Sequence, residues 1–400
     1  MDDALLARYA KLIAGVGANV QRGQQVLVIA APESARLVRA IAAESYARGA
    51  VFVDPWYFDA HVKRVRAELA AEDTLEFFPT WYPTRLLELG EAHGSRISIQ
   101  PNTPPGLMNG VDPGRAGRDQ LPALKEHYTV INAKTTNWCV VPWATPAWAE
   151  VVHPDLAPDD ALAKLWEELV FVLRLDEDDA DAAWRERVSQ LHSAGVKLDQ
   201  AHFSALHFEG PGTDLTVGLL PTSRFSQDEP GSTTVDGINF VANIPTEEVY
   251  TTPDPLRADG VVSATKPLDV GGTVVEGLQV RFEGGRAVAI DAASGADALR
   301  ARCAKDDAAS RLGEVALVDR DGRIGRTGTV FFNTLLDENA ASHLAFGNAY
   351  ETAVGAEDAD RINRSSIHID FMIGGDDVLV TGITADGGRV PVLRGGLWQL

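Results

Sequence analysis

A strand–helix–strand pattern in the first half restricts the fold more than any other feature of the sequence. Residues 25–30 form an apolar run of strand length. Apolar residues then recur at helical spacing over residues 35–48, and a second apolar run follows at residues 50–53. A helix between two strands carries the chain across the sheet, so the two strands run parallel. We therefore expect an α/β N-terminal domain built on a parallel sheet.

The character of the sequence changes after Gly195. Short alternating segments follow, separated by Gly, Asp and Pro, and include residues 207–210, 213–217 and 278–282. Such segments are typical of antiparallel sheets. The sequence thus predicts two domains, an α/β domain over residues 1–190 and a β-rich catalytic domain over residues 191–400.

Charge and cysteine content exclude several classes of function. A formal charge of −21 leaves no basic surface of the kind that binds a phosphate backbone. The N-terminal segment is acidic and amphipathic, and no uncharged apolar stretch reaches about 18 residues. The only cysteines, Cys139 and Cys303, lie outside any zinc-finger spacing. We expect a cytoplasmic protein that binds neither nucleic acid nor membranes, in which a metal site would use oxygen and imidazole ligands.

His368 and Asp370 form the clearest local signal for chemistry. Residues 367–373 alternate, so the imidazole and the carboxylate project from the same face of a strand. Such a pair can bind a cation. Taken alone, such a pair is more often a histidine at the edge of a strand that pairs with a surface carboxylate.

Three glutamates add candidate ligands to this pair. Glu314 precedes an apolar run that predicts burial, and a buried carboxylate is costly unless it is paired or bound to a cation. Glu247 and Glu248 are adjacent in an extended segment, so only one of them can point into a given site. Each glutamate could equally be a surface acid.

Residues 339–350 lack proline and contain several helix formers. We predict a helix here, with His343 and Tyr350 two turns apart on one face. Small residues between them would let a metal or another backbone approach closely. A half-buried histidine without a metal remains an alternative for His343.

Taken together, these segments resemble the aminopeptidase T family of metal-dependent, leucyl-type aminopeptidases. The resemblance runs along nearly the whole chain, with a shorter loop expected between Tyr350 and His368, which affects the wall of the pocket more than the set of ligands. Its most specific motifs are residues 245–248, 337–347 and 368–374. Residues 19–24 and 213–219 extend it.

The resemblance implies a dinuclear metal site and a metallo-aminopeptidase activity on short peptides with a free N-terminus, in a homodimer. The ligands that it implies are Glu248, Glu314, Glu338, His343, His368 and Asp370. This donor set suits Zn²⁺, Co²⁺ or Mn²⁺, with Mg²⁺ also possible, and Glu314 would bridge the two ions. On this hypothesis a water between the ions attacks the first peptide carbonyl and one ion binds the α-amine.

Two further residues receive catalytic roles under the same resemblance. Tyr350 would donate a hydrogen bond to the developing oxyanion. Glu247 would act as general base or would support the neighbouring ligand.

Two other functions compete with this interpretation. A ring-cleaving dioxygenase would use a single iron held by two histidines and one carboxylate, which leaves Glu248, Glu314 and Glu338 without a role. A non-catalytic binding protein would keep the fold without turnover. The retention of every ligand that the resemblance implies disfavours the binding protein.

Overall fold

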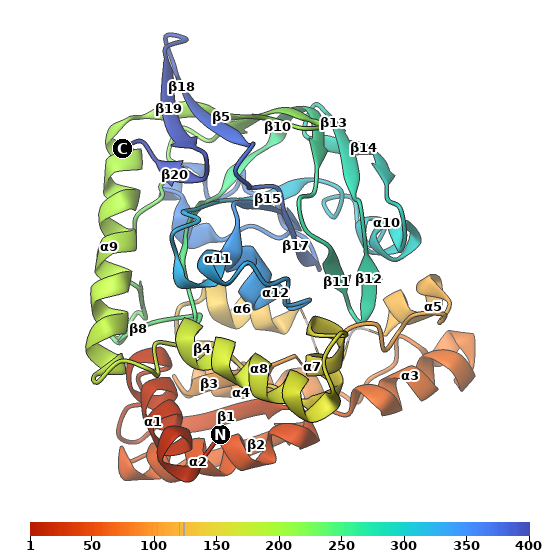
Figure 1. The fold of residues 1–400 in the computed structure, drawn as a ribbon, viewed down its shortest axis with the longest axis vertical. Coiled ribbons are helices and arrows are strands. Elements are labelled where there is room, and N and C mark those ends of the chain that lie inside the picture. The colour runs from red at the N-terminus through yellow and green to blue at the C-terminus, as the bar shows by residue number, and fades with distance from the viewer. Residues whose placement is uncertain (102, 120, 123–124) are drawn as a thin grey trace. The chain divides into compact units, whose positions relative to one another are not determined.

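The structure, a computed structural model, describes residues 1–101, 103–119, 121–122 and 125–400. The chain forms two compact units (Figure 1). Unit 1 comprises residues 1–189 and 231–246, and unit 2 comprises residues 190–230 and 247–400. The domain boundary at residue 190 stays a prediction, and the sequence did not suggest that residues 231–246 pack with unit 1.

Unit 1 is built on a parallel sheet with the strand order β2-β1-β3-β4. Five of the six residues of β1 are buried, as expected for a strand covered on both faces. The predicted parallel pairing of the first two strands is confirmed, because β1 pairs with β2 from Gln25 and Phe52 onward. The strands are β1 (Gln25–Ala30), β2 (Phe52–Tyr57), β3 (Ser95–Gln100) and β4 (Asn137–Pro142).

Helices connect the strands of unit 1 and continue beyond β4. They are α1 (Asp3–Leu12), α2 (Ala35–Ala47), α3 (Ala60–Leu69), α4 (Trp81–Glu91), α5 (Pro113–Arg118), α6 (Glu126–Asn132), α7 (Pro146–Val152), α8 (Pro158–Val172) and α9 (Ala180–Gln200). The last of these leads from unit 1 into unit 2. Among the described residues, no helix combines the length and the apolar character that crossing a lipid bilayer requires.

Residues 231–246 join unit 1 through the free edge of β4. Within this segment β7 (Ser232–Thr233) and β8 (Asn239–Phe240) form a small hairpin. The Val140 amide donates to the carbonyl of Ala242 at 2.8 Å, and the Ile244 amide donates to the carbonyl of Val140 at 3.0 Å. These two bonds extend the ladder of β4 and explain why the segment belongs with the parallel sheet.

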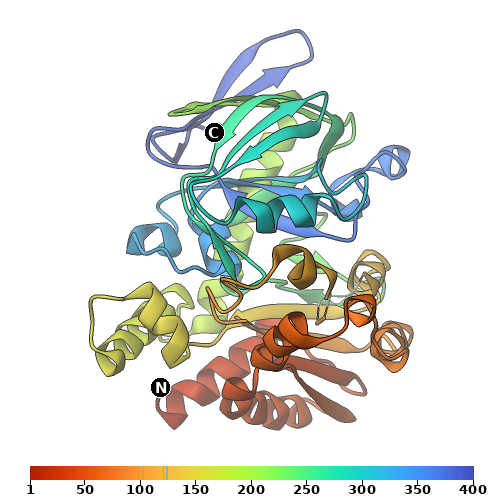
Figure 2. The same cartoon turned by 90° about the vertical axis from the view of Figure 1, so that its right-hand side faces the viewer.

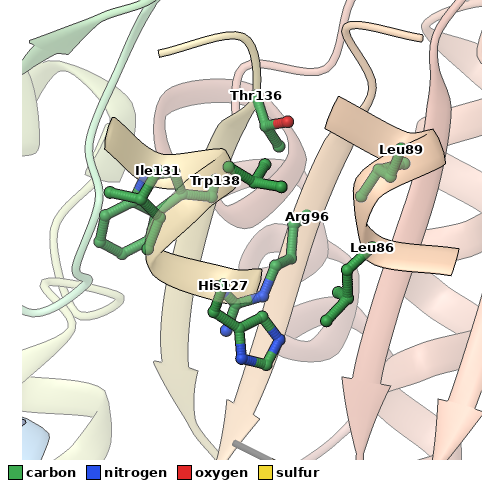
Figure 3. Close-up of a pocket in the computed structure, with 8 residues that line it drawn as sticks. Leu86, Leu89, Arg96, His127, Ile131, Thr136 and Trp138 are labelled. Carbon is green, nitrogen blue, oxygen red and sulfur yellow. The ribbon is translucent and has the colours of Figure 1, made fainter. Parts of the chain in front are cut away.

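A pocket in unit 1 lies between two helices and two strands of the sheet (Figure 3). Arg96 of β3 and Trp138 of β4 are partners in the strand register and both line it. Burial lowers the pKa of Arg96 to about 10, against a smaller opposing effect of Tyr128. The other lining residues are Leu86, Leu89, His127, Val130, Ile131 and Thr136. This pocket contains none of the site residues that the sequence predicts.

Unit 2 contains an eight-stranded antiparallel sheet with the order β14-β13-β10-β6-β5-β18-β19-β20. Its strands are β5 (Phe203–Gly210), β6 (Thr213–Leu219), β10 (Pro253–Ser263), β13 (Gln279–Glu283), β14 (Arg286–Asp291), β18 (Leu379–Thr384), β19 (Arg389–Arg394) and β20 (Leu397–Trp398). A hairpin of β11 (Leu268–Val270) and β12 (Thr273–Val275) and the helix α10 (Ala296–Cys303) accompany it.

A second antiparallel sheet of unit 2 has the order β17-β16-β15-β9. Its strands are β9 (Glu248–Thr251), β15 (Leu312–Val318), β16 (His343–Gly347) and β17 (His368–Met372). One face of this sheet shares a hydrophobic core with the eight-stranded sheet, so Phe346 and Phe371 pack in one cluster with Phe208 and Val217. The two sheets lie one over the other in Figure 2. The predicted architecture, a parallel-sheet α/β region followed by a β-rich region, is confirmed.

The predicted helix over residues 339–350 is wrong. The structure has the short helix α12 (Thr334–Asp337), a 3₁₀ turn at Glu338–Ala340, and then the strand β16. Leu344 and Phe346 alternate with small residues in this strand and face the core. Pairing with β15 and β17 on both sides therefore overrides the helix propensity of the alanines and leucine.

Candidate metal centre

The face of the four-stranded sheet that points away from the core carries most of the candidate ligands. Paired residues of antiparallel strands project from the same face, and Glu314 pairs with Ala345, which pairs with Asp370. His343 lies one pair further along β16, in register with Ala316. The alternation that buries Val315, Leu317, Leu344 and Phe371 in the core therefore directs acids and imidazoles to the opposite face.

Two overlapping groups of ligand atoms form on this face. One consists of Glu248, Glu314 and His343, and the other of Glu314, His368 and Asp370; within each group the ligand atoms lie within 4.8 Å of one another. Glu314 belongs to both groups. Its Oε1 lies 3.9 Å from His343 Nε2, and its Oε2 lies 3.1 Å from His368 Nε2. The two oxygens of one carboxylate thus face two different imidazoles.

The remaining contacts come from the two edge strands of the sheet. Glu248 Oε2 lies 3.1 Å from His343 Nε2, and Asp370 Oδ1 lies 3.3 Å from His368 Nε2. Glu248 reaches the face from β9, the edge strand, while Asp370 comes from β17 at the opposite edge. The site therefore depends on all four strands.

Backbone carbonyls orient both imidazoles. His343 Nδ1 lies 3.2 Å from the carbonyl oxygen of Ala341, and His368 Nδ1 lies 2.8 Å from that of Asn348. A carbonyl oxygen only accepts, so each Nδ1 carries the hydrogen and a neutral ring presents the lone pair of Nε2 to the carboxylates. Two sets of lone pairs facing each other need a proton or a metal ion between them. This arrangement is typical of histidines that bind metals through Nε2.

The shifted pKa values of the side chains on this face reflect the negative charge that is concentrated there. Burial raises the pKa of Glu314, and the charges of Glu248 and Asp370 add to that rise against the opposing contact with His368. Burial also raises the pKa of Glu338 well above its usual range, together with the charges of Asp370, Glu248 and Glu314. Burial of His343 would lower its pKa, but the hydrogen bond and charge of Glu248 outweigh it and raise the pKa to about 9.

The second imidazole–carboxylate pair behaves in the same way. Burial of His368 would lower its pKa, but the charges of Tyr350 and Asp370 and the hydrogen bonds to Asp370 and Glu314 raise it well above its usual range. Burial of Asp370 would raise its pKa, but the charge and hydrogen bond of His368 hold it below its usual range. In the absence of metal ions, protons on the two imidazoles therefore supply the positive charge that cations could provide.

Glu338 and Tyr350 lie beside the two groups without belonging to either. Glu338 begins the 3₁₀ turn after α12 and is 9% exposed, and its carboxylate feels the charges of both groups. Tyr350 follows the end of β16, and its ring centroid lies 5.2 Å from that of His368. It reaches this place from beyond the end of a strand and not from the predicted helix.

Glu247 directly precedes β9, and its carboxylate contacts the start of α11 (Arg323–Thr327). Its side chain is fully buried, its Oε1 accepts a hydrogen bond from the Arg323 amide at 3.3 Å, and its own amide donates to Asn339 Oδ1 at 2.6 Å. Arg323 is the first residue of α11. Glu247 belongs to neither group of ligand atoms.

Sequence reasoning missed Tyr250. This residue lies two positions after Glu248 on β9, on the same face as the ligands, and its ring centroid lies 5.4 Å from that of Tyr350. Burial raises the pKa of Tyr250, and the charges of Glu314 and Glu248 raise it further. The signal was present, because the alternation that directs Glu248 into the site also directs Tyr250 there.

The donor set fits divalent cations. It offers carboxylate oxygens and imidazole nitrogens, which suit Zn²⁺, Co²⁺ and Mn²⁺, and both cysteines are buried elsewhere and contribute to neither group. At the centre of the face, Ala316 and Ala345 are fully buried, and each carries only a methyl group as its side chain. A buried set of four carboxylates and two imidazoles is costly without compensating positive charge.

Enlarging Ala345 should remove the cations. The extra methyl groups of Ala345→Val would occupy the space between Glu314 and Asp370, its register partners. We expect metal content below about a tenth of wild type, measured by elemental analysis after dialysis, because overpacking costs roughly 1–3 kcal/mol and here displaces ligands. Ala205→Val on β5, also a buried alanine, serves as the control for overpacking. Equal metal loss in both variants would contradict the prediction that a larger side chain at position 345 displaces the ligands specifically.

Comparisons with known proteins agree with the geometry of the face. Residues 2–398 match the thermophilic metalloprotease (M29) family. Aminopeptidase T of Thermus aquaticus is 40% identical over 405 residues, which cover 99% of this chain and 98% of that protein. Aminopeptidase AmpS of Bacillus subtilis is 38% identical over 404 residues, which cover 98% of each.

Solved structures give the same result. Wild-type AmpT from Thermus thermophilus superimposes with a TM-score of 0.87 at 38% identity and covers 99% of both chains. A 2,5-dihydroxypyridine dioxygenase from Pseudomonas putida reaches a TM-score of 0.55 at 12% identity, covering 100% of this chain and 98% of that one, which shows a shared fold alone. The predicted resemblance is confirmed, and the chain belongs to the M29 family of thermophilic metalloproteases.

Proposed function

We propose that the chain is an aminopeptidase that removes the N-terminal residue from short peptides at a site for two divalent cations. The observation that carries the proposal is the position of Glu314, whose two carboxylate oxygens face the two separate imidazole groups. The names of relatives that are 38–40% identical over nearly the whole chain support the activity.

Charge balance supports two ions. Glu248, Glu314, Glu338 and Asp370 carry four negative charges when ionised, and two divalent cations would neutralise them. In this proposal Glu248, Glu314 and His343 would hold one ion, and Glu314, His368 and Asp370 would hold the other, with Glu338 beside them as a further ligand. Bound cations supply Lewis acidity, which lowers the pKa of water and polarises a carbonyl oxygen.

The chain's own residues orient and complete this site. The carbonyls of Ala341 and Asn348 hold the imidazoles in the tautomer that leaves Nε2 free to bind. The ring of Tyr350 lies beside that of His368, with the two centroids 5.2 Å apart, and in this proposal its phenol donates to the substrate oxygen in the transition state. Glu247, whose carboxylate accepts from the Arg323 amide, supports the start of β9 and thereby the neighbouring ligand; this position favours a supporting role over that of general base.

The dioxygenase alternative is not favoured. It would need one iron with two histidines and one carboxylate, whereas both histidines here face Glu314 from separate groups. The likeness to the dihydroxypyridine dioxygenase is one of fold, at 12% identity.

Metal analysis and peptide hydrolysis test the function together. Protein purified without chelator should contain about two divalent ions per chain. It should hydrolyse Leu-p-nitroanilide, lose this activity in EDTA, and regain it with Zn²⁺, Co²⁺ or Mn²⁺. N-acetyl-Leu-p-nitroanilide should remain intact, because an aminopeptidase needs the free amine. Hydrolysis of both substrates, or unchanged activity in EDTA, would refute the proposal.

Replacing Tyr350 by phenylalanine should lower kcat by roughly 10²–10³-fold, because one hydrogen bond to the transition-state oxyanion is lost. Metal content should stay the same, as the phenol is not among the proposed ligands. Steady-state kinetics with elemental analysis measure both quantities. Tyr57→Phe on β2, a partly exposed tyrosine of unit 1, is the control. Loss of metal from the Tyr350 variant would instead make this residue a ligand or a structural element.

The expected homodimer and cytoplasmic location are further parts of the proposal, which the resemblance to the aminopeptidase T family supports. Light scattering of the purified protein should give twice the chain mass of 42.9 kDa. A monomer that retains full activity would remove the dimer from the proposal and leave the metal site unaffected.

A further inference from the structure

Asn339 occupies the 3₁₀ turn directly after Glu338, and no solvent reaches it. Its Oδ1 accepts a hydrogen bond from the Glu247 amide at 2.6 Å. Its Nδ2 donates to the carbonyl of Leu335 at 2.9 Å and to Glu338 Oε1 at the longer distance of 3.4 Å. One buried amide therefore contacts two segments that lie 92 residues apart in the sequence.

Both of these segments carry a proposed ligand. The amide N–H of Glu247 lies one residue before Glu248, the first residue of β9. β9 has only four residues and ends the sheet, so pairing with β15 holds it from one side. The side-chain amide of Asn339, which comes from the 3₁₀ turn and not from the sheet, holds the residue before the start of β9. On the other segment, the bond to Leu335 closes the turn that presents Glu338.

The chemistry of the contact requires an amide. The oxygen of Asn339 accepts from the Glu247 amide, which can only donate, and its nitrogen donates to the Leu335 carbonyl, which can only accept. A carboxylate would keep the contact to the Glu247 amide but could not donate to Leu335 and would repel Glu338. An apolar side chain would leave a buried N–H and a buried carbonyl without their partners.

We propose that Asn339 is a positioning residue that sets the spacing between Glu248 and Glu338 and thereby the affinity of the site for its cations. This inference rests on the proposed function, because it takes both glutamates as ligands. Asn339 itself binds neither cation nor substrate. Groups that orient metal ligands in this way commonly change metal affinity by roughly 10–100-fold when they are removed.

The test compares Asn339→Ala with Asn137→Ala. Asn137 of β4 in unit 1 is also fully buried, and its amide bonds to the carbonyl of Ala18 and to the side chain of Gln24. Both variants lose a buried amide with several hydrogen bonds, so both should lose about 5 °C in Tm. Direct titration of the metal-free proteins with Zn²⁺, followed by calorimetry, measures the affinity without reference to turnover.

Asn339→Ala should bind Zn²⁺ about 10–100-fold more weakly than wild type, while Asn137→Ala should bind it normally. Saturating Zn²⁺ should restore the kcat of Asn339→Ala to within about threefold of wild type, because the ligands are intact. Wild-type affinity in Asn339→Ala, equal weakening in both variants, or a kcat that saturating metal does not restore would overturn the proposal. Wild-type protein that binds metal without hydrolysing Leu-p-nitroanilide would refute the aminopeptidase activity, whereas the part of the proposed function on which this inference rests, the metal site, would stand.

Discussion

Glu314→Gln should lower kcat/KM by roughly 10³-fold or more and should weaken both bound cations. The amide keeps the shape of the side chain but lacks the charge, and its nitrogen cannot bind a cation. Glu314 is the residue that the two groups of ligand atoms share, so among the members of these groups it is the one whose substitution is expected to weaken both cations. Elemental analysis and hydrolysis of Leu-p-nitroanilide measure the two effects on one sample.

Variants of the unshared ligands make this prediction sharper. Glu248→Gln should weaken only the cation held with His343, and Asp370→Asn only the cation held with His368, so each should retain about one tightly bound ion. Glu209→Gln on β5, an exposed glutamate of the same unit, should behave as wild type. If Glu314→Gln kept two tight ions, or lost no more than Glu248→Gln does, Glu314 would not bridge.

The metal-free protein should lose stability as the pH rises from about 6.5 to 9. The pKa of His343 is raised from 6.5 to about 9, so the folded state holds a proton that the unfolded state has released in this window. Stability is then fully present below pH 6.5 and is lost as the pH passes about 9. The raised pKa values of Glu314 and Glu338 act in the same direction. The lowered pKa of Asp370 acts only at acid pH.

The shift of His343 alone corresponds to an effect on the order of 3 kcal/mol, since this side chain is 1% exposed. A loss of roughly 10 °C in Tm between pH 6 and pH 9 is therefore expected in EDTA. Bound cations replace the protons, and their affinity rises with pH, so the metal-loaded protein should lack this loss. Thermal unfolding at several pH values, with and without metal, measures the difference.

His343→Gln provides the control, because it removes one of the titrating groups and should reduce the pH dependence of the metal-free protein, while His368, Glu314 and Glu338 still contribute. Two results would speak against a proton standing in for a cation. One is equal stability at pH 6 and pH 9 in EDTA. The other is the same decline with metal bound.

The architecture of the two halves could be predicted because it rests on local patterns. Each of the patterns that predict β1, α2 and β2 is contained in a short stretch of sequence. Hydrophobic periodicity therefore predicts these elements without information from distant residues. The alternating segments after Gly195 likewise predict β5, β6 and β13. The packing of residues 231–246 with unit 1 depends on contacts of Ala242 and Ile244 with Val140, just over a hundred residues away, which no local pattern contains.

The alternation of side chains with a period of two residues predicted the site correctly in β17 but was not recognised in β16. It correctly placed His368 and Asp370 on one face of β17. The same alternation is present from His343 to Gly347, but alanine and leucine there also favour a helix, and only the flanking strands decide between the two. The proposed ligands came from the resemblance to a family, and the structure brings five of them together in two groups.

The sequence by itself determined the fold class, the family and the chemical types available for a site, because each is a property of neighbouring residues or of motifs. Only the tertiary structure decided that Glu314 faces both histidines, that β16 is a strand, and that Asn339 joins two ligand-bearing segments. The physical reason is distance along the chain. Register between strands and the spacing of ligands on a sheet arise when segments far apart in the sequence pack against each other, as β5 and β18 do.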